Sequence, residues 1–251
     1  YMWCYLSPLP GCKLIQFRFH LSRSGEVVNT ELHDFVGRLQ NDGYGGYAHL
    51  REKPEITAFG CLSHARRKFA EVVKIATPKS ASKAQEALRY SAELYRVESQ
   101  AREQKLSADE RKQLRQTEAL PVLNKFFEWL SQTKAQVPPK SKVGMAISYA
   151  LKQWPYLAIY VNDGEVEADT NWVENQIRPF AVGRRNWLFV GHEKSAQIGA
   201  LFYSLIQSAK LNGWMSRRSA CNAASSLPNT DRSREPTSHS LPHRCRVLGG
   251  F

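Results

Sequence analysis

The sequence has 251 residues, 42% of them hydrophobic, which is long enough to bury a substantial core in one large domain or in a domain with an insertion. Thirty-five Lys and Arg residues against 23 Asp and Glu residues give a net charge of +12, which favours a polyanionic partner, most simply nucleic acid. The five cysteines form no Cys-x-x-Cys pair, which argues against a disulfide framework or a zinc ribbon. No signal peptide and no apolar run of membrane-spanning length are found, so we expect a cytoplasmic protein with no membrane partner.

Two strands are predicted near the start of the chain, which begins at a tyrosine inside the first of them, as a fragment would. Met2–Leu6 is apolar and aromatic, a Ser-Pro-Leu-Pro-Gly break follows, and Lys13–Leu21 then alternates between polar and apolar residues. This pattern indicates a hairpin with one buried face, on which His20 is a strand residue rather than a ligand. Apolar residues at helical spacing next predict a helix over roughly Val28–Leu39, which includes Asp34.

A short apolar strand is expected to end at Asp42, within the stretch LQNDGYGGY. Taken alone, the Asp42-Gly43 dipeptide favours a simple turn. A catalytic role for this aspartate therefore depends on the resemblance described below.

Another strand is predicted at Ile56–Phe59, and it leads into the stretch GCLSHARRKF. Cys61 and His64 are of the types that bind metals, but two ligands do not make a structural zinc site. Three cations that suit contacts with DNA phosphates follow: Arg66, Arg67 and Lys68. A solvated helix face is the alternative interpretation of these cations.

Residues 80–155 are predicted to be helical. Apolar periodicity indicates helices around Ala84–Tyr95, Leu120–Leu130 and Val143–Trp154, and a further helix opens at Leu106-Ser107. Most of the charge in the helix around Ala84–Tyr95 and in the helix that opens at Leu106-Ser107 is expected to be solvated surface.

A further helix is predicted to start at Asn171, a plausible N-cap, and to end or kink at Pro179. Glu174 and Arg178 are four residues apart and share its polar face. The Asn171-x-x-Glu174 spacing also fits a capping box, so a purely structural role for the glutamate is open at this point. After a turn at Gly183, two arginines precede Trp187–Val190, which is typical of a short buried strand.

The last amphipathic helix is predicted over Ala196–Leu211. The residues expected to face inward are Ile198, Leu201, Phe202, Leu205, Ile206 and Ala209. From Trp214 the periodic apolar pattern stops, so residues 214–251 are predicted to be a largely disordered tail that arose from a reading-frame shift. The alternative is that these residues form a genuine basic tail that binds DNA.

Three of these stretches together resemble the catalytic domain of DDE transposases of the insertion-sequence 66 family. The longest match is to the C-terminal motif, and it comprises Asp169, Asn171, Glu174, Ile177, Arg178, Pro179, Phe180, Gly183, Arg184, Arg185, Asn186, Trp187, Leu188 and Phe189. Leu39–Tyr44 resembles the second catalytic motif, Leu-Gln-x-Asp-Gly-Tyr. Residues 61–69 resemble the Cys-x-x-His-Ala-Arg-Arg-Lys-Phe signature. Asn175 stands where the family usually has Arg, and Leu62 and Ser63 stand where it usually has Trp and Ala.

The resemblance, which covers about residues 1–213, implies an α/β fold. That fold is a ribonuclease-H-like mixed sheet lacking its first strand, with a large all-helical insertion. Residues 1–75 and 156–213 are expected to form the catalytic core, residues 76–155 the helical insertion, and residues 214–251 the tail.

The implied activity is metal-dependent cleavage and transfer of DNA strands, with Asp42 and Glu174 as catalytic carboxylates that bind Mg²⁺ (or Mn²⁺). The family's first catalytic aspartate, in an Asp-Glu-Thr motif, is not found, so impaired activity is expected. A catalytically inactive DNA-binding remnant is the alternative.

The expected partners are the transposon ends, target DNA and further copies of the chain, in the bacterial cytoplasm and on the nucleoid. The residues expected to contact DNA are His64, Arg66, Arg67, Lys68, Arg178, Arg184 and Arg185. The residues expected to surround the metal-binding side chains without binding the metal themselves are Cys61, Asp169 and Asn171.

Overall fold

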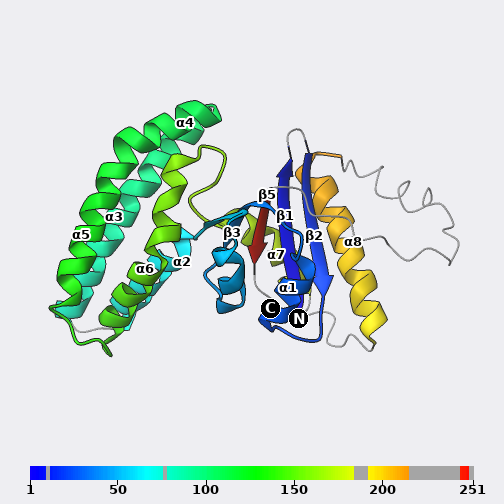
Figure 1. Cartoon of the computed structure of the whole chain (residues 1–251), viewed down its shortest axis with the longest axis horizontal. Coiled ribbons are helices and arrows are strands. Elements are labelled where there is room, and N and C mark those ends of the chain that lie inside the picture. The colour runs from blue at the N-terminus through cyan, green and yellow to red at the C-terminus, as the bar shows by residue number, and fades with distance from the viewer. Residues whose placement is uncertain (10–11, 76–77, 184–191, 215–243, 249–251) are drawn as a thin grey trace, which may run out of the picture. The chain divides into compact units, whose positions relative to one another are not determined.

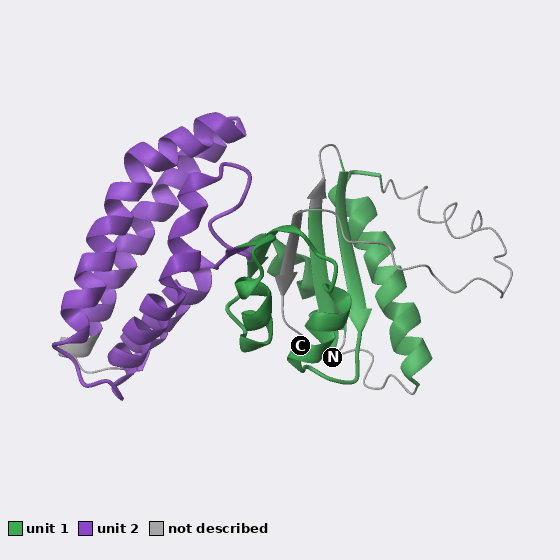
Figure 2. Cartoon of the chain, viewed as in Figure 1, with its two compact units in different colours: residues 1–57, 172–251 green, residues 58–171 purple. Residues whose placement is uncertain are grey.

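The computed structural model describes residues 1–9, 12–75, 78–183, 192–214 and 244–248, and the chain divides into two compact units (Figure 2). The sheet unit comprises Tyr1–Thr57 and Trp172–Phe251, and the helical unit comprises Ala58–Asn171. The helical unit takes in more of the chain than the expected insertion at 76–155. Helix α2 (Leu62–Ile75) belongs to it because Phe69 and Val72 share a buried cluster with residues of the following helices.

A five-stranded mixed sheet forms the centre of the sheet unit (Figure 1). Its strands, in the order β2-β1-β5-β3-β4, are β1 (Met2–Leu9), β2 (Cys12–Phe19), β3 (Gly37–Asn41), β4 (Ile56–Phe59) and β5 (Arg244–Leu248). Strands β1 and β2 are antiparallel over their whole length, which confirms the predicted hairpin. Strand β5 pairs antiparallel with β1 and parallel with β3, so the sheet mixes both orientations.

Strand β5 is the part of residues 214–251, predicted to be largely disordered, that the structure describes as a strand. Cys4 of β1 lies opposite Leu248, and Leu39 of β3 lies beside Cys245. An extended segment here pairs with the backbone of both β1 and β3, which otherwise present unpaired donors and acceptors. The rest of the predicted tail beyond residue 214 lies outside the described residues.

The helix predicted over Val28–Leu39 is shorter than expected and is followed by a strand. Helix α1 spans Gly25–Glu31, and Asp34 lies in the turn after it. Gly37 has a φ of 114°, a conformation that glycine adopts readily and a helix cannot contain. Leu39 is therefore a fully buried residue of strand β3.

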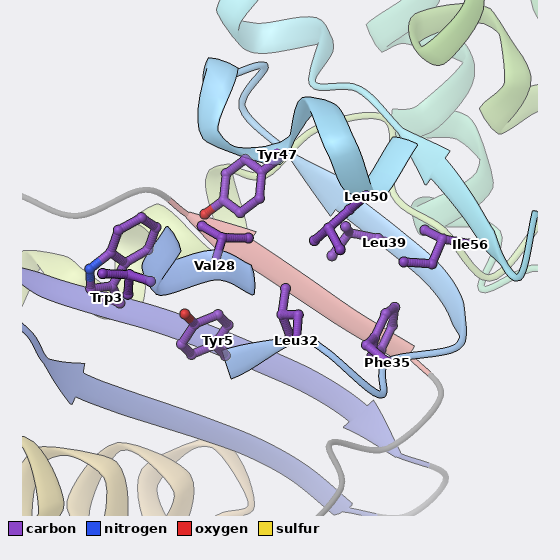
Figure 3. Packing of buried hydrophobic residues seen from close by; sticks show 10 residues of the cluster. Trp3, Tyr5, Val28, Leu32, Phe35, Leu39, Tyr47, Leu50 and Ile56 are labelled. Carbon is purple, nitrogen blue, oxygen red and sulfur yellow. The ribbon is translucent and has the colours of Figure 1, made fainter. Parts of the chain in front are cut away.

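Alternate residues of β1 bury opposite faces of the sheet. On one face, Trp3 and Tyr5 pack with Val28 of α1 and with Tyr47 of the 3₁₀ helix η1 (Gly45–Glu52) (Figure 3). The rings of Trp3 and Tyr47 meet edge to face, with 6.4 Å between their centroids. On the other face, Met2, Cys4 and Leu6 pack with residues of α7 (Asn171–Gly183) and α8 (Glu193–Leu211).

Helix α8 presents a polar face to the edge of β2, so the predicted inward face is wrong. Ser204 Oγ accepts a hydrogen bond from Phe17 N at 2.8 Å, and Ser208 Oγ accepts one from Ile15 N at 3.0 Å. Five residues predicted to face inward are 40–58% exposed: Ile198, Leu201, Phe202, Leu205 and Ile206. The reason is that the backbone of an edge strand needs polar partners, which the apolar face cannot supply.

The helical unit confirms the predicted series of helices. They are α2, α3 (Pro78–Glu103), α4 (Ala108–Leu114), the π-helical η2 (Arg115–Ala119), α5 (Leu120–Lys134), α6 (Lys142–Ala158) and the 3₁₀ helix η3 (Ile159–Asn162). Ser107 caps α4 in a full capping box with Glu110, as the opening at Leu106-Ser107 predicted.

A buried ion network ties these helices together. Arg115, fully buried at the start of η2, lies 2.8 Å from Glu98 of α3 and donates to the carbonyl of Val166 at 2.9 Å. Arg111 of α4 lies 2.6 Å from both Glu98 and Glu167, and these carboxylates hold the pKa of Arg111 above its usual value although burial lowers it. Because burial removes these cations from water, their carboxylate partners are needed to offset the free-energy cost of desolvation.

Candidate active site

Asp42 lies immediately after strand β3 and is half-buried. Its Oδ1 accepts a hydrogen bond from Tyr44 N at 2.9 Å, and Asn41 Oδ1 accepts one from Gly43 N at 3.0 Å. Gly43 has a φ of 85°, which favours glycine at this position. The Asp-Gly turn is therefore present, and it fixes the direction of the Asp42 carboxylate at the strand end.

Glu174 lies in the first turn of α7 and is half-buried. The helix is held against the sheet by its neighbours Val173 and Ile177, which are buried in one cluster with Cys4 and Leu6 of β1. A helix bound through these positions keeps the backbone of Glu174 close to the sheet surface.

The start of α7 differs from the prediction, and of the two predictions for Pro179, an end or a kink, the end is excluded. Asn171 is the first helical residue rather than the cap, and Asp169 supplies the carboxylate there. Asp169 Oδ1 accepts from the backbone N of Asn171 at 3.0 Å, and Asp169 Oδ2 accepts from its side-chain Nδ2 at 2.9 Å. The helix also continues past Pro179 to Gly183, because a proline removes only one backbone donor and the apolar face still packs on the sheet.

Carboxylates of the sheet unit are the groups suited to a hard metal ion. Asp42 and Glu174 both belong to this unit, and Mg²⁺ is commonly bound by one or two carboxylates, with water and phosphate oxygens completing the shell. Within the described ranges, no group of three or more His, Cys, Asp or Glu residues could hold a metal ion.

Cys61 is buried, and its sulfur is surrounded by hydrogen-bonding groups. Thr170 donates to Sγ from its backbone N at 3.2 Å and from Oγ1 at 3.1 Å. Ser63 Oγ lies 3.0 Å and His64 Nδ1 lies 3.1 Å from the same sulfur. Burial raises the pKa of the Cys61 thiol, but His64, Ser63 and Thr170 together outweigh burial, so the pKa lies below its ordinary value.

Tyr95 of α3 contacts Asp169, the residue before the Cys61 partner Thr170, and sequence reasoning missed this contact. Its hydroxyl donates to Asp169 Oδ2 at 2.7 Å across 74 positions of sequence. Burial and the negative charge of Asp169 raise the pKa of Tyr95, so the phenol stays protonated as a donor. In the sequence Tyr95 is only one apolar position of a helical pattern, and no local signal pointed to this contact.

The cations expected to contact DNA have different surroundings. Arg66, Arg67 and Lys68 are exposed on α2, and Arg178 is exposed on α7. His64 is half-buried against Cys61, which gives it a structural contact in addition to the predicted DNA contact. The expected contacts Arg184 and Arg185, and the strand predicted at Trp187–Val190, lie outside the described residues.

None of the helices in the described part of the chain is both long and apolar enough to cross a lipid bilayer.

Comparisons with known proteins identify the family. The family model described as Transposase IS66 family matches residues 1–198. Uncharacterized protein y4jD of Sinorhizobium fredii (strain NBRC 101917 / NGR234) is 36% identical over 211 residues, which cover 81% of this chain and 40% of that protein. Uncharacterized protein y4qI of the same strain is 32% identical over 234 residues, which cover 86% and 42%.

The chain thus spans about two fifths of the length of these curated relatives. No solved structure gives a significant match. Since the family model covers most of the sequence, the chain belongs to the IS66 family of transposases.

Proposed function

We propose that this chain is a catalytic domain of a DDE transposase with a ribonuclease-H-like core, whose ancestral activity is Mg²⁺- or Mn²⁺-dependent cleavage and transfer of DNA strands. Asp42 and Glu174 are its metal-binding catalytic residues. It acts in the bacterial cytoplasm on transposon ends and target DNA, with other copies of the chain, and its activity is impaired.

One observation carries this proposal. A half-buried aspartate follows a strand of the mixed sheet, and a half-buried glutamate lies on a helix whose apolar side packs on that sheet. The resemblance to DDE transposases implies this placement of the second and third acidic residues, on a strand end and on a flanking helix.

A bound pair of divalent ions would activate the attacking oxygen and stabilise the leaving oxygen. The chain's own residues hold and orient the reactants. Asp42 is oriented by its turn, and Glu174 by the packing of α7. Arg178 lies four residues after Glu174 on the same side of the helix and is exposed, so it suits a contact with a backbone phosphate. The exposed cations of α2 suit further phosphate contacts.

A DNA-binding remnant without catalysis is the second candidate function. It is favoured because the described residues contain no group of three or more His, Cys, Asp or Glu side chains that could hold a metal ion. A site with two carboxylates binds divalent ions more weakly than a site with three, because fewer negative charges offset the dehydration of the ion. The remnant would keep salt-sensitive DNA binding through its excess of cations.

The two functions are separated by a nicking assay on supercoiled DNA with Mg²⁺ or Mn²⁺. Asp42→Asn and Glu174→Gln remove one charge each with little change in shape, and Asp34→Asn, in the turn after α1, is the matched control. We expect each of the first two to lower the nicking rate by roughly 100-fold or more, and the control to leave it unchanged.

Each result decides between the candidates. Nicking that both substitutions abolish supports the carboxylate site. Absent nicking, with salt-sensitive DNA binding that neither substitution alters, supports the remnant. Nicking that persists in both variants refutes the assignment of Asp42 and Glu174.

A further inference from the structure

The chain crosses between the two units twice. Cys61 is close in sequence to the first crossing, and it is hydrogen-bonded to a residue just before the second. The chain enters the helical unit at Ala58 and leaves it after Asn171. Cys61 comes three residues after the entry point, and its hydrogen-bond partner Thr170 comes just before the exit. The two segments therefore meet within the helical unit itself.

Three hydrogen bonds join the entering segment to the leaving one. The backbone N of Leu62 donates to the carbonyl of Ala168 at 3.0 Å. The other two run from Thr170 N and Thr170 Oγ1 to the sulfur of Cys61. Helix α7 starts one residue after Thr170, so the sulfur holds the backbone at the point where this helix begins.

The number of donors around the sulfur favours an ionised Cys61. Thr170 N can only donate, and its hydroxyl is also directed at the sulfur, while Ser63 Oγ and His64 Nδ1 lie within hydrogen-bond distance. A thiolate accepts from all of these groups, whereas a thiol must direct its own proton at one of them. Hydrogen bonds to an ionised acceptor are also stronger than those to a neutral one.

We propose that Cys61 is a positioning residue, a buried thiolate that fastens the segment before α7 to the start of α2 and thereby fixes the backbone where α7 begins. Any effect on catalysis rests on the proposed function. The fastening of the two segments does not.

The titratable groups around the sulfur come from three elements. His64 lies on α2, Asp169 precedes α7, and Tyr95 of α3 hydrogen-bonds to Asp169. A charge on Cys61 raises the pKa of Tyr95, and the charge of Arg66 lowers it, so these groups act on one another. Burial opposes the thiolate, and the hydrogen bond and charge of His64 are the largest of the effects that favour it, which makes His64 the decisive neighbour.

Hydrogen exchange of the full-length chain tests the fastening directly. Cys61→Ala removes the acceptor, so we expect exchange of the backbone amides around Thr170 and Asn171 to rise by about tenfold or more. Cys61→Ser keeps a shorter, weaker acceptor and should give a smaller rise. Cys12→Ser, at the half-buried start of β2, is the control and should leave this segment unchanged. Unchanged exchange in Cys61→Ala would overturn the proposal.

Ultraviolet absorbance of the thiolate tests the charge state. The spectrum of the native chain minus that of Cys61→Ser should contain thiolate absorbance at a pH below the usual pKa of a free cysteine, about 8.5. A difference spectrum without thiolate absorbance below that pH would overturn the thiolate. If Cys61→Ala fails to fold, Thr170→Val removes one donor and keeps the backbone amide, and a rise in exchange confined to the start of α7 supports the proposal. Unchanged exchange there overturns it.

Nicking kinetics distinguish a failure of the proposed role of Cys61 from a failure of the proposed function. If the native chain nicks DNA, Cys61→Ala should lower kcat while the affinity for DNA stays the same, and Cys61→Ser should recover part of the loss. If the native chain does not nick DNA, the proposed function fails, and the exchange and absorbance results still decide whether Cys61 fastens α7.

Discussion

The guanidinium of Arg115 lies 2.8 Å from the carboxylate of Glu98, and the two side chains are 0% and 4% exposed. Glu98 also lies 2.6 Å from Arg111, so one carboxylate serves two cations. Replacing it with a neutral group leaves positive charge without compensation inside the helical unit.

Glu98→Gln is therefore expected to destabilise the helical unit by about 3–5 kcal/mol, the usual range for breaking a buried ion pair. Hydrogen exchange of α3 and α5 measures this loss locally. Arg96→Met is the control, because the Arg96–Glu118 pair at 3.3 Å is largely solvated and should contribute less than about 1 kcal/mol. Equal effects of the two substitutions would contradict the prediction.

Ser208 supports the outer edge of the sheet. Its hydroxyl accepts from Ile15 N at 3.0 Å and lies 3.2 Å from Ile15 O, so Ser208→Ala leaves both backbone groups without that partner. We expect a loss of about 1–3 kcal/mol, seen as faster hydrogen exchange in β2. Ser195→Ala, on an exposed position of α8, should have no effect there. The interpretation of α8 as an edge cover is wrong if β2 exchanges equally in both variants.

The lowered pKa of Cys61 predicts how stability depends on pH. Hydrogen bonds and charge from His64 outweigh burial, so the folded pKa lies below the unfolded value of about 8.5. Between these two values the unfolded chain binds more protons, so this contribution to stability rises with pH and is lost as pH falls through the folded pKa.

Chemical unfolding at a series of pH values checks this sign. The native chain should gain stability relative to Cys61→Ser as the pH rises toward about 8.5, and the difference should then level off. A difference that is constant or that falls with pH would show that Cys61 is a neutral thiol.

The register of β5 predicts a cross-link. Cys4 lies directly opposite Leu248 in an antiparallel pair, where Cα atoms are about 4.5–5.5 Å apart, within the range that a disulfide spans. Leu248→Cys should therefore form an intramolecular disulfide on mild oxidation, detected by mass spectrometry of the digested chain. Val247→Cys, opposite Tyr5, should not bond to Cys4. If Val247→Cys forms the disulfide with Cys4 instead, the register of β5 differs by one residue from the pairing described here.

The exposed cations of α2 predict a change in the salt dependence of DNA binding. Replacing Arg66, Arg67 and Lys68 with alanine should reduce the slope of log affinity against log salt by about 0.9 for each phosphate that these side chains neutralise in the native chain. Lys152→Ala, exposed on α6, is the control. An unchanged slope in the triple variant would assign these side chains to a solvated surface.

Local patterns predicted the hairpin and most of the helices, because alternation and helical periodicity follow directly from which side chains are buried. The same patterns placed Asp42 at a strand end and Glu174 on a helix. They failed where the partner was distant in sequence. Tyr95 finds Asp169, and the serines of α8 find the backbone of β2, through contacts that only the folded chain creates.

The central place of β5 has a consequence for the order in which the molecule is made. Its partner strand β1 leaves the ribosome well before β5, so the pair from Cys4 to Leu248 must wait until all the residues between these strands have been synthesised. The helical unit, whose helices follow one another in sequence, can fold during that delay. The sheet closes after the helical unit has been made, so until then the nascent chain presents the open sides of β1 and β3 to chaperones and to other chains.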